Sequence, residues 1–233
     1  MRKLNAPGDS VQDVFSTCIE SYRDAALKNR LRSIVPVLSD EASRFEDCVL
    51  TSKTHTIPTA DNVGGVVSKA EMLDIYESKF VKGTGRPYYD KYMSLPTNGK
   101  CPFCGIGTVS TLDHYLPKSK YPALAITPKN MIPACRDCNL GKKRTFSPQN
   151  SEEEPLHPYF DDVEQDIWLS VRFEVAGKEL VPTYFVRKPV AWNDLLFRRV
   201  ENHMVLYNLY TSYAVHAAEE NYRPIGYMAC LSR

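Results

Sequence analysis

The sequence predicts an α+β fold in which mostly helical segments surround one small strand–loop–strand–helix unit. Apolar residues recur at helical spacing over most of residues 11–82 and again in 193–220. Two Cys-x-x-Cys pairs bracket two short β-prone runs within residues 96–150. Two more β-prone runs, separated by Gly177-Lys178, predict a small hairpin in the C-terminal part that packs on the core.

These patterns divide the 233 residues into an N-terminal helical region (1–95), a central unit (96–150) and a C-terminal hairpin with a helix (151–233). We expect the three to pack as one body, because a hydrophobic fraction of 43% is enough for an ordinary core. The formal charge of +1 excludes a general polycation. The apolar runs are shorter than the ~20 residues of a membrane span, so the sequence predicts a soluble protein of the cytoplasm.

The first half of the chain is expected to be helical. Asp9-Ser10 can cap a helix from Val11 to about residue 29, with a second helix starting near residues 25–27 and running through Val35. Pro36 marks a boundary or a kink, after which a short helix could run from about residue 39 to 50.

A loop and one more helix complete this half. Residues 51–65 are rich in loop-forming types. Residues 68–82 are predicted to be helical because Ser68 and Glu71 have the spacing of a capping box. A long helical stretch is also expected from Asn193 to about Glu220, either continuous or interrupted.

Four of the seven cysteines are paired by motif: Cys101, Cys104, Cys135 and Cys138. Two dithiol pairs predict one structural zinc site, because tetrahedral Zn²⁺ needs four soft ligands and each pair supplies two from one tight turn. The pairing by motif indicates a reducing compartment. Cys18, Cys48 and Cys230 lie in apolar surroundings and are expected to be small buried hydrophobes.

Between the cysteine pairs lies a set of residues that can bind a hard cation and activate water. Residues 108–115 should form a strand, 118–129 a loop, 130–133 a returning strand and 135–145 a helix. This order would bring together Asp113, His114, Asn130 and Asn139.

Each of these side chains has a chemical role that suits it. His114 is the best general base, because its near-neutral pKa lets it take a proton from water. Asp113 and Asn139 can supply oxygen ligands to Mg²⁺ or Mn²⁺, and Asn130 is better placed to orient the loop and the imidazole. Adjacent strand residues point to opposite faces, so Asp113 and His114 can serve one site only at a strand end or a local twist.

The same stretch is locally basic, with seven lysines and arginines and one acid, Asp137, between His114 and Phe146. Positive potential beside a metal-binding set suits a substrate that carries phosphate. The candidates for nucleic-acid binding are Lys118, Lys120, Lys142, Lys143 and Arg144. A solvated basic loop is the alternative.

These residues resemble the HNH endonuclease family, whose ββα-metal core often carries a four-cysteine zinc clamp. The family has an Asp-His pair on the first strand, an Asn in the loop and a His or Asn on the helix after the second cysteine pair. Asp113-His114, Asn130 and Asn139 match this pattern. The resemblance implies cleavage of DNA phosphodiester bonds that leaves 5′-phosphate and 3′-hydroxyl ends, with RNA left open as a substrate.

A finer resemblance is to HNH proteins that accompany an ATPase in bacterial anti-phage systems of the Septu type. It depends on LDHYLPKS at 112–119, PACRDCN at 133–139 and HPYFDD at 157–162. This resemblance implies an ATPase partner and a role in defence. Within HPYFDD, His157 could complete the metal site or fix a buried turn, and the second role is favoured because Asn139 already fills the ligand position.

A rival from another class is a zinc-stabilised nucleic-acid-binding or adaptor module without catalysis, acting in a larger complex. In that case Asp113 and His114 form a structural pair near zinc. The sequence carries no signal for the oligomeric state or the biological trigger.

Overall fold

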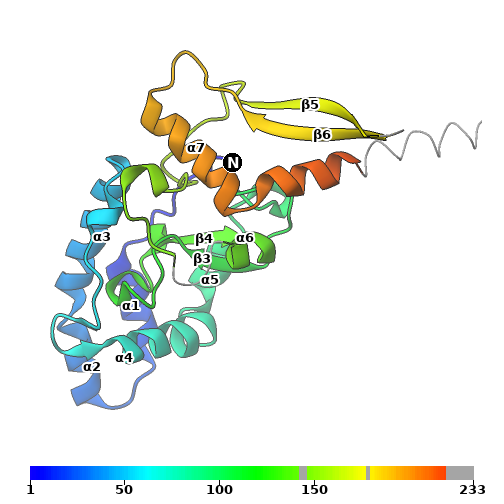
Figure 1. The fold of residues 1–233 in the computed structure, drawn as a ribbon. Coiled ribbons are helices and arrows are strands. Elements are labelled where there is room, and N and C mark those ends of the chain that lie inside the picture. Colours follow the sequence, from blue (N-terminus) through cyan, green and yellow to red (C-terminus); the bar gives the residue numbers. More distant parts are fainter. Residues whose placement is uncertain (142–145, 177–178, 219–233) are drawn as a thin grey trace, which may run out of the picture.

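The computed structural model describes residues 1–141, 146–176 and 179–218 and confirms the α+β class (Figure 1). The helices are α1 (Val11–Glu20), α2 (Ala25–Arg32), α3 (Val35–Leu50), α4 (Lys69–Asp74), a π-helix (Ile75–Val81), α5 (Arg86–Met93), α6 (Arg136–Gly141) and α7 (Asp194–Leu206). The strands are β1 (Asn62–Val63), β2 (Val67–Ser68), β3 (Thr111–His114), β4 (Met131–Ala134), β5 (Leu169–Ala176) and β6 (Glu179–Val186), which pair as three two-stranded antiparallel sheets. Short 3-10 helices lie at Thr54–Thr56, Thr97–Gly99, Pro122–Leu124, Pro128–Asn130 and Ser151–Glu153.

The N-terminal helices begin and end at other residues than the sequence predicts. The expected helix over 11–29 ends at Glu20, and Asp24 caps a new helix by accepting from the backbone N–H of Ala26 at 2.8 Å. The expected short helix near residue 39 is the continuation of α3, which starts at Val35 with Pro36 in its first turn. Proline is tolerated there because first-turn N–H groups have no partner within the helix.

The helix predicted over 68–82 forms with an unexpected change of winding. The capping box is confirmed: the Ser68 side chain accepts from the Glu71 N–H, and the Glu71 carboxylate accepts from the Ser68 N–H at 2.9 Å. After α4 the chain continues as a π-helix, Ile75–Val81. Glycine is required soon afterwards, because a Cβ on Gly85 would lie 2.7 Å from the Cys18 sulfur.

The central unit has the expected order of strand, loop, strand and helix. β3 pairs with β4 in a register that sets Asp113 opposite Ile132 and His114 opposite Met131. Ile132 belongs to one hydrophobic cluster, which contains the cysteines and α7, and Met131 belongs to the other, which contains α1 and the π-helix. Since residues paired across strands share a face, each face of this sheet closes a different cluster.

The C-terminal part forms the expected hairpin and an interrupted helix. β5 and β6 pair over their full length from Leu169↔Val186 to Ala176↔Glu179, while Gly177 and Lys178 lie outside the described residues. The expected packing on the core is wrong for most of the hairpin. Leu169 and Val186 at its base pack against a core cluster, whereas Phe173 and Val175 are 54% and 76% exposed.

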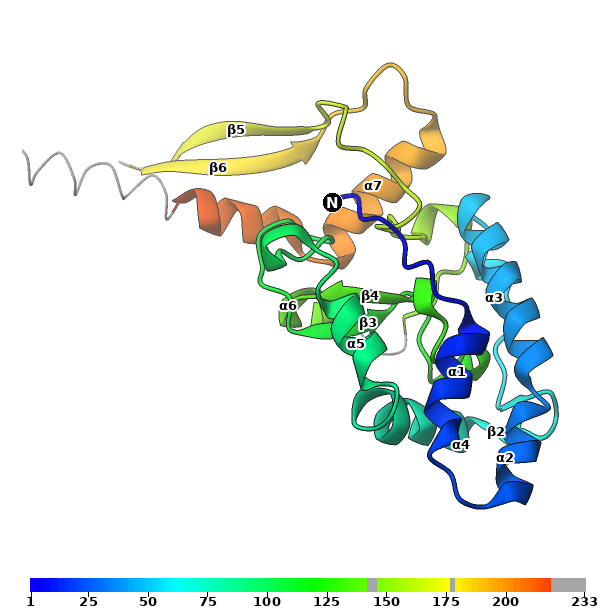
Figure 2. The same cartoon turned by 180° about the vertical axis from the view of Figure 1, so that it is seen from behind.

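The long helical stretch breaks at residues 207–208, where Asn208 has a positive φ of 52°, and resumes over 209–218. The projecting hairpin lies beside this second segment in both views (Figures 1 and 2). The rings of Tyr184 and Tyr213 make the contact, with centroids 5.7 Å apart. Among the described residues, none of the helices has the length and apolarity that crossing a bilayer requires.

Candidate functional site

The four paired cysteines form a compact buried cluster. Their sulfur atoms all lie within 4.8 Å of one another, and the Cys104 and Cys135 sulfurs are 3.8 Å apart. Zinc bound by four tetrahedral sulfurs at about 2.3 Å holds those sulfurs about 3.8 Å from one another. The cluster therefore fits the expected zinc ion in both donor type and spacing.

The four thiols interact with one another and with backbone N–H groups. Hydrogen bonding with Cys101 is the main cause that lowers the pKa of Cys104, and the same thiol raises the pKa of Cys138. The backbone N–H of Gly107 donates to the Cys104 sulfur at 3.3 Å, and that of Cys138 to the Cys135 sulfur at 3.5 Å. Sulfurs that accept from backbone N–H groups and crowd one another are stabilised as thiolates by a divalent ion.

A glycine allows the two knuckles to approach. A Cβ on Gly107 would lie 2.8 Å from both the Cβ and the sulfur of Cys135. Gly105 has a φ of +74°, a left-handed conformation that lets the chain turn back directly after Cys104. A side chain at position 107 would push Cys135 away, and a side chain at position 105 would be strained by the positive φ.

Beside the cysteine cluster lies a cleft of about 570 Å³. Its lining comes from α4, the π-helix, α5, β3, the loop after β3 and α6. The lining includes four of the predicted site residues: Asp113, His114, Lys118 and Asn139. Because β3 ends at His114, two adjacent residues can line the same cleft despite the alternation of a regular strand.

The ring of His114 is held in one orientation. His114 is 7% exposed, and its Nε2 lies 2.8 Å from the carbonyl oxygen of Ala125. A carbonyl only accepts, so Nε2 carries the proton and the lone pair of the neutral ring is on Nδ1. The rings of Tyr76 and His114 pack in a T-shaped arrangement, with centroids 4.8 Å apart.

Asn130 lies behind the cleft rather than in it. The residue is fully buried, and its Oδ1 accepts from the Leu116 N–H at 2.8 Å while its Nδ2 donates to the carbonyls of Leu116 and Leu124 at 3.0 Å. The amide thus ties together two distant points of the loop that carries Ala125. Asn130 therefore acts on His114 indirectly, by fixing the loop whose Ala125 carbonyl accepts from the imidazole.

His157 is not brought to the cleft. Its Nδ1 accepts from the Tyr159 N–H at 3.2 Å, and its Nε2 donates to the Lys129 carbonyl at 3.1 Å. The ring is fully buried and lies against the ring of Tyr115, with centroids 4.5 Å apart. The geometry favours the structural alternative for His157 over the metal ligand.

The basic candidates are placed unequally. Lys118 lies in the cleft wall, where its ammonium donates to Glu77 at 2.6 Å and sits 3.9 Å above the Tyr76 ring. Lys120 is half-buried outside the cleft lining, and its carbonyl accepts from the Ala60 N–H. Lys142, Lys143 and Arg144 lie outside the described residues.

Sequence reasoning missed two residues of the cleft, Tyr76 and Glu77. Both lie on the π-helix and line the cleft opposite β3. Tyr76 is buried at 5% exposure, but no pattern in the sequence indicated that its face of the helix covers a histidine. The sequence signal that could have pointed to these residues is an aromatic residue next to an acidic one, soon after a helix start with a capping box.

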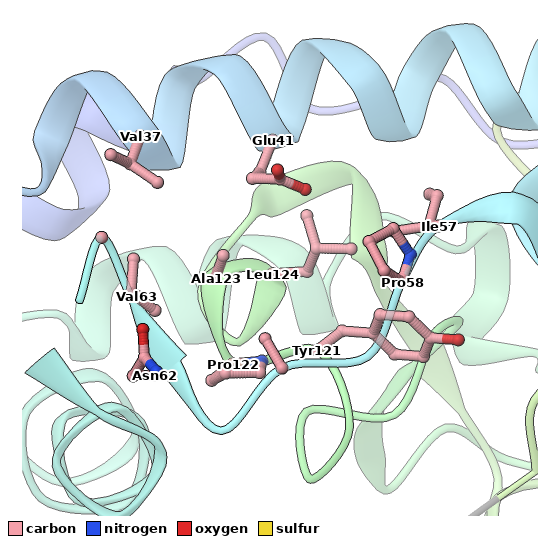
Figure 3. A pocket seen from close by; sticks show the side chains of 12 residues that line it. Val37, Glu41, Ile57, Pro58, Asn62, Val63, Tyr121, Pro122, Ala123 and Leu124 are labelled. Atoms are coloured by element: carbon pink, nitrogen blue, oxygen red, sulfur yellow. The ribbon is translucent and has the colours of Figure 1, made fainter.

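A second cavity of about 150 Å³ lies between α3, β1 and the chain that follows Pro117 (Figure 3). Apolar side chains dominate its wall, with Glu41 at one side and Asn62 at another (Figure 3). Among the described residues, its lining includes no histidine, cysteine, lysine or arginine. It therefore lacks the groups that the larger cleft offers for chemistry on phosphate.

The fold and the site define an α+β protein with a buried four-cysteine cluster, suited to zinc, next to a cleft that contains histidine, carboxylate, amide and lysine. The chain is 28% identical to Protein ea31 of Escherichia phage lambda over 94% of its own length and 77% of that protein. It is 31% identical over 102 residues to Septu protein PtuB of Bacillus thuringiensis, an alignment that covers 41% of this chain and 38% of that protein. No family model and no solved structure matches the chain.

Proposed function

We propose that the protein is a metal-dependent endonuclease of the HNH type that hydrolyses phosphodiester bonds in DNA. The observation that carries the proposal is the cleft, which gathers Asp113, His114, Asn139 and Lys118 from three parts of the chain. The part of the sequence that resembles HNH nucleases and the weak homology to PtuB support it.

His114 would act as the general base. With the proton of the neutral ring held at Nε2 by the Ala125 carbonyl, the Nδ1 lone pair can accept a proton from water. Lys118 would hold a phosphate oxygen by charge-assisted hydrogen bonds. Asn130 would act on the reaction indirectly, by fixing the loop that orients the imidazole.

Asp113 and Asn139 would hold Mg²⁺ or Mn²⁺, since both offer oxygen donors in the wall of the same cleft. When bound there, the cation would neutralise charge on the scissile phosphate and on the leaving 3′ oxygen. Zinc would stay in the cysteine cluster with a structural role, because four thiolates leave it no open position for water.

The test is plasmid cleavage by the purified protein and by His114→Ala, with Mg²⁺, with Mn²⁺ and without added metal, while bound zinc is measured. We expect nicking or linearisation that needs both the added cation and His114, with about one zinc retained per chain. His216→Ala is the matched control, because that exposed histidine lies outside the cleft lining and its loss should leave cleavage intact.

If folded, zinc-loaded wild type and His114→Ala bind DNA equally and neither cleaves it, the result favours the rival function, a zinc-stabilised binding or adaptor module. Repeating the assay with single-stranded RNA decides between DNA and RNA as substrate. The ends of the product should be 5′-phosphate and 3′-hydroxyl, which ligation of the cleaved plasmid measures.

We further propose that the nuclease is an effector of anti-phage defence that works with an ATPase partner. The similarity to Septu protein PtuB and the three motifs of the Septu-type resemblance support this. Phage plating on cells that carry the chain with its genomic neighbours tests it: wild type should reduce plaque number, and His114→Ala should restore it. Equal protection by both would exclude a role for catalysis.

A further inference from the structure

One acidic side chain, Glu77, faces the basic side of the cleft. Its Oε1 accepts from the Lys118 ammonium at 2.6 Å, and both residues line the cleft with His114. The Glu77 side chain is 56% exposed and that of Lys118 is 25% exposed, so the pair lies at the mouth.

The π-helix fixes the position of this carboxylate. Tyr76, the preceding residue, is buried and its ring contacts both the imidazole of His114 and the ammonium of Lys118. A π-turn inserts one residue into the helical repeat and changes which side chains face a neighbour, and such turns recur at functional sites. Here the π-helix places the Tyr76 ring against the Lys118 ammonium and the Glu77 carboxylate within hydrogen-bond distance of the same ammonium.

The pair is poorly explained by stability. Exposed ion pairs contribute little to folding, because water screens them and ordering two long side chains costs entropy. A negative charge at the mouth of a cleft also repels a polyanion. Glu77 therefore opposes the binding for which Lys118 is suited, unless its contact with Lys118 has a purpose of its own.

We propose that Glu77 is an electrostatic latch, meaning a carboxylate that occupies the Lys118 ammonium until a substrate phosphate displaces it. The inference rests on the proposed function, since it takes phosphate as the ligand of Lys118. The latch makes the cleft select for ligands with high charge density and limits weak binding to other nucleic acid. Glu77 is a specificity-determining residue in this scheme and takes no part in bond breaking.

The latch is tested by fluorescence anisotropy with a labelled DNA duplex at fixed salt, in a His114→Ala background without added divalent cation. Glu77→Gln should bind about three- to tenfold more tightly, because it removes the competing charge and keeps the shape. In a Lys118→Met background the same substitution should change affinity less than about twofold, since the latch acts through Lys118. Asp74→Asn is the charge-matched control, because that exposed acid lies one turn away and outside the cleft lining.

Weaker binding by Glu77→Gln would overturn the latch and indicate that the carboxylate helps to hold a ligand. If Glu77→Gln tightened DNA binding equally with and without Lys118, or if Asp74→Asn tightened it as well, the effect would be one of net charge. Either result would also overturn the latch. Cleavage is measured in a separate assay. Latch behaviour without cleavage would refute only the proposed nuclease function, and cleavage without latch behaviour would refute only the latch. Absence of DNA binding by every variant refutes both.

Discussion

Asn130 shows how one amide can fix the loop that orients a histidine. Asn130→Asp keeps the acceptor for the Leu116 N–H but replaces two donors by a carboxylate oxygen that faces two carbonyls. We expect the free energy of unfolding to fall by about 2–4 kcal/mol, since buried acceptors and a buried charge would be left without donors. Urea denaturation measures this.

Asn139→Asp is the matched control, because Asn139 is half-buried at the cleft rather than enclosed. The same substitution there should cost less than about 1 kcal/mol. Equal losses at the two positions would contradict the assignment of Asn130 as the residue that holds the loop.

Glu71 gives a prediction about pH. Its bond to Arg30 is the main cause that lowers its pKa from 4.5 to about 2. A carboxyl with a lowered folded pKa stabilises the protein above the unfolded value, and this contribution is lost as pH falls from about 4.5 towards 2. Glu71→Gln should be less stable than wild type at pH 7 by about 1 kcal/mol or less, since the pair is half exposed.

The measurement is the difference in free energy of unfolding between wild type and Glu71→Gln at pH 7 and at pH 3. The difference should shrink at pH 3, where the unfolded carboxyl is protonated. A constant difference would show that the capping bonds, and not the charge, carry the effect. Any loss of zinc in acid is common to both proteins.

At the level of residues, the sequence was enough to select four of the side chains that line the cleft, Asp113, His114, Lys118 and Asn139. Asp113 and His114 are adjacent in sequence, and Asn139 follows a cysteine that the cluster fixes in space. Glu77 could not be selected, since its approach to Lys118 depends on how the π-helix winds. His157 was open between two roles because only packing shows that both of its ring nitrogens are engaged.

Among the elements, α7 is tied to the segment after α6 by one buried arginine. Arg199 is 4% exposed, donates to both oxygens of Asp161 at 2.9 and 2.7 Å, and also donates to the carbonyls of Glu154 and Pro155. Arg199→Met should cost about 3–5 kcal/mol, because it removes the cation that pairs with Asp161 and the donor to the Glu154 carbonyl. Thermal unfolding measures this loss.

The neighbouring Arg198→Met is the control, since Arg198 is exposed and pairs with Glu201 on the same helix. It should change stability by about 0.5 kcal/mol or less. Adding Asp161→Leu to Arg199→Met should recover part of the loss, because the unpaired charge is then gone. A double variant as unstable as the single one would assign the cost to lost packing instead.

Helix boundaries were the least predictable feature of the elements. The sequence of residues 11–29 keeps a helical period through Ser21 and Arg23, yet Asp24 offers a better start for a second helix than continuation of the first. Pro36 was ambiguous for a similar reason, since proline both ends helices and begins them. The extended position of the β5–β6 hairpin also follows from packing at its base, which periodicity does not encode.

Across the whole molecule, three distant segments bond to the first cysteine knuckle. The carbonyl of Pro102 accepts from the Arg2 N–H at 2.7 Å, that of Phe103 from His203 Nε2 at 3.0 Å, and that of Cys104 from the Tyr213 hydroxyl at 2.8 Å. Burial lowers the pKa of His203 to about 3, so this donor is a neutral ring. The first cysteine knuckle thus bonds to the N-terminal segment, α7 and the helix over 209–218.

Loss of zinc should therefore loosen parts of the chain that are far apart in sequence. Cys135→Ser should abolish zinc binding and lower the melting temperature by more than about 10 °C, because binding energy of a structural zinc is folding energy. Amide hydrogen exchange should increase at Arg2 and in residues 209–218. Cys48→Ser, at a half-buried cysteine outside the cluster, should leave zinc content and exchange unchanged.

The sheet of β3 and β4 is buried on both faces, and each face completes a different hydrophobic cluster. Neither cluster can open without exposing the strand residues that the other needs, so we expect the chain to melt in a single cooperative transition. Differential scanning calorimetry should show one peak whose calorimetric and van't Hoff enthalpies agree. The residues of the cleft, at the end of this shared sheet, would then be lost together with both clusters and not before them.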